Sequence, residues 1–462
     1  MSRTALLVCV IPVCLALAAT SARAQRAAPP AAEPDETQAP AVVRLTAEEA
    51  VAGAIAASPR LARLAALETA AEAQRRGARA ERWPQLDLSA GYQYRSNIPE
   101  LAIFAPTGDP TVPVQRIVVF PNINDNWSTR VGLAQPVYTG GRIRSGIEAA
   151  EQGRRAAEQD LRAGRADLVL ETRTAYWSLV TARESLRVIQ ESIKAYDAHL
   201  GDARNRERFG MAARNEVLAV QVERDRAELE QISAAAGSEL AQANLQRLLD
   251  LPAATRIETA QALAAPAPPP ADVEALVAEA VGARPERQAL AARVAAAEAT
   301  AGGERAARLP QLAINGTYNY ANPNRDIVPP TTDWKQTWYV GMGVSWNALD
   351  FGRRAANEAR ARAQADAARA QLRELDRSIR LEVTQRALDL RTAQARLAVA
   401  ERSVESALEN RRVAGERYRA GVIPSSELLD AEIAHERAAL SQTEAMAALR
   451  LAGAGLDRAV GR

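Results

Sequence analysis

The chain has 462 residues, of which 47% are hydrophobic but only 4% are aromatic. So few large side chains argue against a thick conventional core and favour thin seams between helices. The formal net charge of +2 comes from Arg3 and Arg23 near the N-terminus, so the rest of the chain is balanced. A balanced chain lacks the basic excess typical of nucleic-acid binding, and we expect no nucleic-acid partner.

Residues 1–24 have the pattern of a secretory signal peptide, with an apolar run and a small-x-small cleavage site that ends at Ala24. The run is short for a transmembrane anchor, which is the alternative. The two cysteines, Cys9 and Cys14, both lie in this segment. Cleavage near Ala24 therefore excludes disulfides and thiolate sites from the mature protein. Residues 25–43 are rich in Ala, Pro and acids, which predicts a disordered leader.

The chain from residue 44 onward contains two similar halves. Residues 142–208 align with residues 353–419 without a gap, and matching strand patterns precede both segments. We therefore predict two structural repeats, 44–252 and 272–462. A proline-rich linker over 253–271 connects them.

Each repeat contains one segment that is unusually long for a helix. Neither 142–208 nor 353–419 contains a proline, and a helix over either segment would be about 100 Å long at about 1.5 Å per residue. In the second segment Leu390, Leu397 and Val404 recur every seven residues, with alanines interleaved. This spacing predicts the seam of a left-handed coiled coil, in which alanine allows close backbone approach.

Shorter helices precede and follow each long segment. Glycines mark the turns after the long helices, at Gly210 and Gly421. The shorter helices are predicted over 46–80, 215–249, 272–307 and 425–460, with breaks at Pro59 and Pro285.

Two strand hairpins are predicted, over 83–138 and 309–348, because apolar residues occupy every second position in both segments. In the last strand Trp338 and Trp346 share a face, about 26 Å apart at about 3.3 Å per residue. That separation fits the lipid-facing aromatic girdles of an outer-membrane barrel. A loop separates the strands of the first hairpin, and it contains Pro106, Pro110 and Pro113.

Four strands cannot close a membrane barrel, because the smallest such barrels contain about eight. Open sheet edges are not tolerated in lipid, so we expect several copies of the chain to share one barrel. The alternative is a soluble antiparallel sheet with one buried face. The connection of each hairpin to a very long helix in a secreted chain disfavours that alternative.

The duplication, the hairpins, the signal peptide and two short motifs together resemble the TolC-like outer membrane efflux proteins. The motifs are Pro-Gln-Leu at 84–86 and 310–312, and Tyr418-x-x-Gly421 ahead of Leu-Leu-Asp-Ala at 428–431. The resemblance covers nearly all of 44–460. It implies a mainly α fold in which duplicated helical hairpins form an α-barrel tunnel. It also implies a homotrimer, with four strands from each chain contributing to one 12-stranded outer-membrane β-barrel.

The same resemblance implies partners. The tunnel would dock onto a periplasmic adaptor protein and an inner-membrane transporter, with the turns at Gly210 and Gly421 in contact with the adaptor. Outer-membrane lipid would surround the barrel. Glu427 and Asp430 match the positions of an acidic ring at the periplasmic aperture, where six carboxylates of a trimer would attract cations.

Two further residues match a clasp that holds the aperture shut in relatives. These are Glu216 and Tyr418. A basic residue often joins that clasp two positions after the turn glycine, but Ile423 stands there in this chain. Arg214 and Arg417 are the cations that could replace it.

No catalytic site can be assembled from these residues, and we expect no enzyme activity, cofactor or metal. The mature chain has no cysteine, no glycine-rich phosphate loop, and two histidines far apart in sequence. His199 and His435 are each predicted to be surface residues of a helix.

The sequence thus predicts a passive outer-membrane exit duct of a tripartite efflux or type I secretion system. One alternative is a periplasmic adaptor, although adaptors carry one helical hairpin between β-rich modules. The other is an elongated coiled-coil structural protein, which leaves the duplicated strands without a role. The pattern does not identify the substrate.

Overall fold

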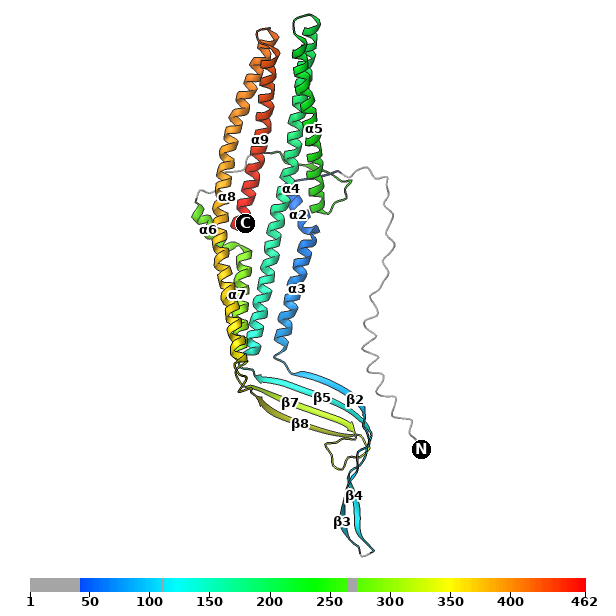
Figure 1. Ribbon diagram of the computed structural model, residues 1–462. Helices are drawn as coiled ribbons and strands as arrows, with labels where there is room; N and C mark the ends of the chain where they lie inside the picture. The colour runs from blue at the N-terminus through cyan, green and yellow to red at the C-terminus, as the bar shows by residue number, and fades with distance from the viewer. Residues whose placement is uncertain (1–41, 110, 264–271) are drawn as a thin grey trace.

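The computed structural model describes residues 42–109, 111–263 and 272–462 (Figure 1). The expected signal peptide, most of the expected leader and the proline-rich part of the linker lie outside these residues. The described chain is elongated: two helix turns lie at one end, and a twisted sheet lies at the other. Helices run in parallel between the two ends, so the fold is long and thin, as the scarcity of large side chains indicates.

The two long helices have the same bounds as the expected segments, with α4 over Arg142–Arg208 and α8 over Arg353–Arg419. Each starts after a glycine in the left-handed region, with φ of 97° at Gly141 and 90° at Gly352. Glycine adopts this conformation without the steric cost of a side chain, so it allows a strand to turn sharply into a helix. The return helices are α5 over Arg214–Leu249 and α9 over Ser425–Val460.

The predicted seam is buried over most of its length. Leu390, Ala393, Leu397 and Ala400 of α8 are 4–6% exposed and pack against α9 and α6 (Val273–Ala283). Val404, at the next seam position, is only half-buried. Alternating alanine and leucine therefore brings the backbones of neighbouring helices close together without a thick core.

The helices at the start of each repeat break at proline, as predicted. Helix α2 (Ala47–Ala57) is followed by α3 (Pro59–Ala80), and α6 is followed by α7 (Pro285–Ala306). Each proline takes the first position of the second helix, where its missing N–H group is not needed. Thr46 and Glu49 form a reciprocal capping box at the start of α2.

The bounds of the leader and the linker require correction. Strand β1 (Val42–Leu45) pairs in parallel with β6 (Arg256–Thr259), so the leader ends before Val42 and the linker contains a strand. Ile257 is 0% exposed, and the Tyr176 hydroxyl donates a hydrogen bond to the Leu45 carbonyl at 3.0 Å. The long helix α4 thus holds both segments in place, an effect that composition alone does not reveal.

The sheet contains β2 (Gln85–Tyr94), β5 (Asp125–Tyr138), β7 (Gln311–Asn322) and β8 (Lys335–Ser345), in that order and all antiparallel. The register aligns apolar residues across the sheet: Leu88, Val131, Tyr318 and Trp338 form one row, and Leu86, Leu133, Gly316 and Val340 form another. A polar row on the opposite face comprises Ser89, Arg130, Asn319 and Thr337. The apolar face is uncovered, since Leu88 is 72% and Trp338 71% exposed.

Two details of the strands differ from the prediction. The loop expected around Pro106, Pro110 and Pro113 is largely a second hairpin, with β3 over Leu101–Asp109 and β4 over Val112–Phe120, while residue 110 lies outside the described residues. Alternating β-branched and aromatic residues outweigh the prolines there, because the two strands have no other strand beside them and their outer edges need no N–H donor. The last strand ends at Ser345, so Trp346 lies just beyond it, where its indole N–H donates to the Arg308 carbonyl at 3.1 Å.

Buried ion pairs join the two repeats near the middle of the molecule. Arg458 of α9 is 9% exposed and binds Asp167 of α4 at 2.6 Å and also Glu286 of α7. Within the second repeat, Arg284, 7% exposed, binds Glu382 of α8 at 2.5 Å. Because removing one partner leaves a buried charge uncompensated, this network fixes how the helices of the two repeats are aligned.

Within the described residues, no single helix is long and apolar enough to cross a membrane. Helices α2 and α3 meet the same criterion of length and composition only as a pair, and the pair is bent by 50°.

We expect Leu390→Ala to destabilise the protein by about 2–5 kcal/mol, because it leaves a cavity in the alanine–leucine seam. Gln385→Ala on the same helix is the matched control, since this side chain is polar and exposed. Thermal unfolding in a mild detergent, followed by circular dichroism, measures both. An equal loss of stability in the two variants would contradict the assignment of the seam.

Candidate functional site

The residues expected at the aperture meet at the end of the molecule that carries the two helix turns (Figure 1). Both turns have the same construction, with φ of 72° at Gly210 and 75° at Gly421. In each turn the amide of the next residue donates to a carbonyl five residues earlier, from Met211 to Arg206 and from Val422 to Arg417. The glycines therefore end the long helices in the usual left-handed cap.

Tyr418 is the centre of the interactions at this end. It is 3% exposed and packs with Ala414, Ile423, Leu428 and Ala431 in an apolar cluster. Burial raises the pKa of its phenol, while the nearby Arg206 guanidinium lowers it. The hydroxyl is buried without a hydrogen-bond partner in the described chain. Ile423, which replaces the expected basic residue, completes this cluster and makes it apolar.

The cation of this cluster comes from the first repeat. The Arg206 guanidinium lies 4.2 Å from the centre of the Tyr418 ring, and it donates to the carbonyl oxygens of Tyr418 at 2.7 Å and Arg419 at 3.3 Å. These carbonyls belong to the last turn of α8, where helical carbonyls lack partners within the helix. Arg206 therefore caps α8 from α4, a role for which the sequence suggested Arg214 or Arg417.

His199 does not lie at the surface, and that prediction was wrong. The side chain is buried between α4 and α9, with Nδ1 3.0 Å from Glu432 and Nε2 2.9 Å from the Ser425 hydroxyl. Its ring also meets the ring of Tyr418 edge-on at 5.2 Å. His435 is half-buried, and burial together with Arg411, 3.3 Å away, lowers its pKa. We call Tyr418, Arg206, His199, Ser425 and Glu432 the turn cluster.

The acids expected at the aperture lie on the outside of the chain. Glu427 and Asp430 are exposed in the first turns of α9, next to the buried Leu428 and Leu429. They form no ion pair among the described residues and are free to face a pore. Glu216 is half-buried at the start of α5 and contributes to the raised pKa of Tyr418, but the described residues show no hydrogen bond between the two side chains.

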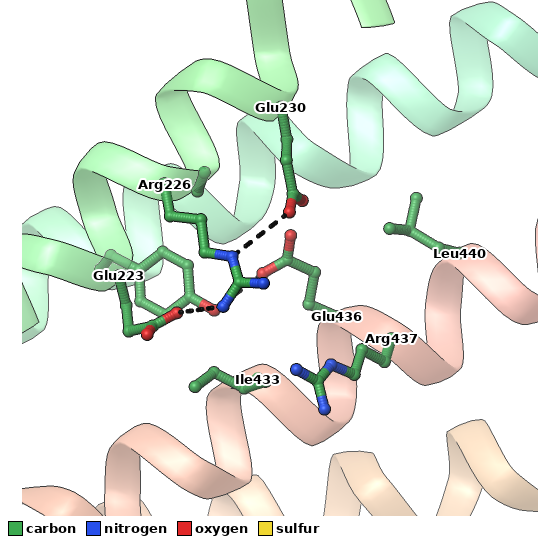
Figure 2. Close-up of a pocket in the computed structure, with 9 residues that line it drawn as sticks. Glu223, Arg226, Glu230, Ile433, Glu436, Arg437 and Leu440 are labelled. Atoms are coloured by element: carbon green, nitrogen blue, oxygen red, sulfur yellow. Dashed lines mark hydrogen bonds and ion pairs between the residues drawn. The ribbon is translucent and has the colours of Figure 1, made fainter. Parts of the chain in front are cut away.

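A small cavity lies next to the turn cluster, between α4, α5 and α9 (Figure 2). Its volume is about 110 Å³, and three carboxylates surround it: Glu223, Glu230 and Glu436. Arg226 forms long ion pairs with Glu223 at 3.8 Å and with Glu230 at 3.9 Å. Glu436 is 7% exposed and accepts a hydrogen bond from the Tyr196 hydroxyl at 2.7 Å. Burial raises the pKa of Glu436.

Comparison with known proteins gives the context of this site. The model of the outer membrane efflux protein family matches residues 51–250 and 276–462. The chain belongs to this family. It is an outer-membrane efflux duct, and the family is one of channels rather than enzymes. A search of curated protein sequences found no match.

Solved structures of outer-membrane channels share the fold of this efflux protein. The OprN channel matches with a TM-score of 0.76 at 22% identity, over 90% of this chain and 89% of its own. VceC of Vibrio cholerae matches with a TM-score of 0.75 at 19% identity, over 90% and 96%. CmeC of Campylobacter jejuni gives 0.74 at 18%, over 90% and 85%.

Sequence reasoning missed the most buried polar members of the turn cluster. His199 follows Tyr196 by three positions and precedes Ala203 by four, and both of these are seam residues with 2% and 0% exposure. On a helix, residues three and four apart share a face, so this spacing was a usable signal. No comparable local signal exists for Arg206, because it reaches a helix that lies more than 200 positions away in sequence.

We expect Arg206→Gln to loosen the turn of the second repeat. A charge-assisted cap contributes about 1.5–3 kcal/mol, so local opening should increase roughly tenfold or more. Amide hydrogen exchange of residues 417–424 measures this opening. Arg204→Gln is the matched control, because Arg204 lies two positions earlier on α4 and, among the described residues, its side chain donates to Gln221 and makes no contact with the turn of the second repeat. Equal exchange in both variants would contradict the capping role.

We expect Glu436→Gln to stabilise the protein at pH 7.5 but not at pH 4. The pKa of Glu436 is raised in the folded state. The folded state therefore binds this proton more tightly than the unfolded state does, and protonated Glu436 stabilises the folded protein at low pH. This contribution is lost as the pH rises from the unfolded pKa through the higher folded pKa. Glutamine keeps the acceptor for Tyr196 without the charge. The difference in unfolding temperature between variant and parent should grow with pH, whereas Glu444→Gln, at an exposed site on the same helix, should show no such growth.

Proposed function

We propose that the protein is the passive exit duct of a tripartite efflux or type I secretion system, in the form of a homotrimer. The observation that carries this proposal is the four-stranded sheet. One of its faces is apolar and uncovered, its other face is polar, and β2 and β8 leave both edges open. Large exposed apolar patches mark interaction surfaces. Three such sheets joined edge to edge would give a 12-stranded barrel with its apolar face toward lipid.

The helical part supports the same assembly. Helices α4, α5, α8 and α9 are nearly parallel, and apolar residues remain exposed on α5 and α8, including Leu229 and Leu388. In a trimer these faces meet the neighbouring chain, and twelve helices surround a tunnel. Trp338 and Trp346 remain the proposed residues of the lipid-facing girdle, at 71% and 59% exposure. Signal-peptide cleavage near Ala24 is part of this proposal.

At the periplasmic end, Glu427 and Asp430 would form the acidic ring, while Tyr418 with Glu216 would restrain the aperture. The turns at Gly210 and Gly421 are the proposed contacts with a periplasmic adaptor, which connects the duct to an inner-membrane transporter. Substrate would pass through the polar interior without chemistry, driven by the partner pump. The adaptor and structural alternatives lose support, since the family is that of the ducts.

Planar-bilayer recording of the detergent-purified mature protein tests the proposal, with its mass determined in the same detergent. Trimers that insert and give small, cation-selective steps are expected. A monomer or dimer without conductance would contradict both the shared barrel and the duct.

Replacing the acidic ring by Glu427→Gln with Asp430→Asn should reduce cation selectivity and the block by multivalent cations. The reason is that six carboxylates at a narrow opening concentrate cations. The reversal potential in a salt gradient measures selectivity. A matched variant, Glu444→Gln with Asp457→Asn on the same helix, should conduct as the parent does. Unchanged selectivity in the first variant would remove these acids from the pore.

A further inference from the structure

The junctions between strands and helices lie at the end of the sheet that faces the helices (Figure 1). The Arg142 guanidinium lies 3.8 Å from the Glu81 carboxylate, and the Trp346 indole donates to the Arg308 carbonyl at 3.1 Å. Gly140 packs so closely on Leu309 that an added Cβ would lie 2.9 Å from the Leu309 Cβ. These contacts connect four segments, 81–84, 138–144, 307–310 and 346–354, which we call the junction band.

Large apolar side chains are exposed along the whole junction band. They are Trp83 at 70%, Tyr138 at 50%, Leu309 at 43%, Trp346 at 59%, Leu349 at 71% and Phe351 at 93% exposure. Tyr138 pairs with Leu312 in the sheet and Trp346 directly follows β8, so the band adjoins the apolar face of the sheet. The chain has only 4% aromatic residues, so a cluster of exposed rings indicates that an apolar partner contacts the junction band.

Phe351 is the most unusual of these residues. Its φ of 52° places it in the left-handed region, where a residue with a Cβ is sterically strained. The matching position of the first repeat is Gly140, with φ of 63° and no such cost. Since the ring is 93% exposed, no contact within the chain offsets this strain. A contact outside the chain would do so.

The same band is strongly basic. Its four segments contain six arginines and two carboxylates, Glu81 and Asp350, which gives these segments a net charge of +4 on a chain whose total formal net charge is +2. Arg82, Arg144 and Arg353 are exposed and form no ion pair with the described residues. The first turns of α4 and α8 contain no acidic residue, although the positive end of each helix dipole lies there. The two carboxylates of the band are already paired, Glu81 with Arg142 at 3.8 Å and Asp350 with Arg354 at 3.4 Å, so they leave the positive charge of the other arginines uncompensated.

We propose that the junction band binds anionic phospholipids in the inner leaflet of the outer membrane. The exposed aromatic rings lie among the upper acyl chains, and the arginines contact the phosphate groups just below them. Lipid fits this surface for two reasons. The band adjoins the proposed lipid-facing side of the sheet, and it places apolar groups next to basic groups, as the boundary between acyl chains and phosphate groups of a membrane requires. This inference rests on the proposed membrane position of the sheet.

The test compares the parent with the triple variant Arg82→Gln, Arg144→Gln and Arg353→Gln. The control variant is Arg63→Gln, Arg373→Gln and Arg391→Gln, which removes three exposed helical arginines outside the band. Each protein is reconstituted in nanodiscs of phosphatidylcholine alone or with 30% phosphatidylglycerol, and its unfolding temperature is measured. Binding of phosphatidylglycerol in detergent is measured by native mass spectrometry.

Phosphatidylglycerol should raise the unfolding temperature of the parent and the control, and high salt should reduce this gain. The triple variant should lose most of the gain and bind phosphatidylglycerol at least about tenfold more weakly, since each basic residue at an anionic surface contributes about fivefold. Its behaviour in phosphatidylcholine should match that of the parent. Phe351→Gly, which restores the residue type of the first repeat, should lower the unfolding temperature in nanodiscs but not in detergent.

An equal gain in the triple variant and the parent would overturn the lipid site while leaving the duct intact. Absence of any phosphatidylglycerol effect on a parent that inserts and conducts would do the same. A parent that enters neither kind of nanodisc would instead contradict the proposed function, and the lipid site with it.

Discussion

The fold depends on close packing along two helices of 67 residues each. A helix of this length cannot bury its apolar stripe against itself, so it requires partners along its whole course. Alanine at alternating seam positions allows α4 and α8 to approach α5, α7 and α9, and the ion pairs of Arg458 and Arg284 fix their alignment. The sheet at one end and the turn cluster at the other are held at a set distance by these helices.

This arrangement separates two tasks along one molecule. At the sheet, the chain exposes apolar rows and a basic band, which suit a boundary between lipid and water. At the turns, it buries a histidine and a tyrosine beside a half-buried arginine and leaves Glu427 and Asp430 of α9 exposed. Arg206 connects the turns of the two repeats directly. If the pair α4–α5 moves relative to the pair α8–α9, this contact must either break or move with both pairs.

The duplication explains both the symmetry of the molecule and its departures from symmetry. The two repeats share glycine turns and proline breaks at matching positions. Where they differ, the difference is informative: Gly140 is matched by the strained Phe351, and the first hairpin carries the additional strands β3 and β4. In each repeat alone, the edge of β5 or of β7 that pairs across the repeats would be open, so the two repeats complete one sheet together.

The sequence by itself determined the helices, most strand positions, the duplication and the family resemblance, because periodicity, proline and glycine act locally. Trp338 could be placed on the apolar face of its strand from alternation, whereas Glu427 and Asp430 were assigned to an aperture only through the family resemblance. Only the tertiary structure decided that residues 42–45 and 256–259 form a sheet, that His199 is buried, and that Arg206 rather than Arg214 or Arg417 meets Tyr418. These contacts join segments about 200 residues apart, and their geometry follows from how the long helices align, which no local pattern encodes.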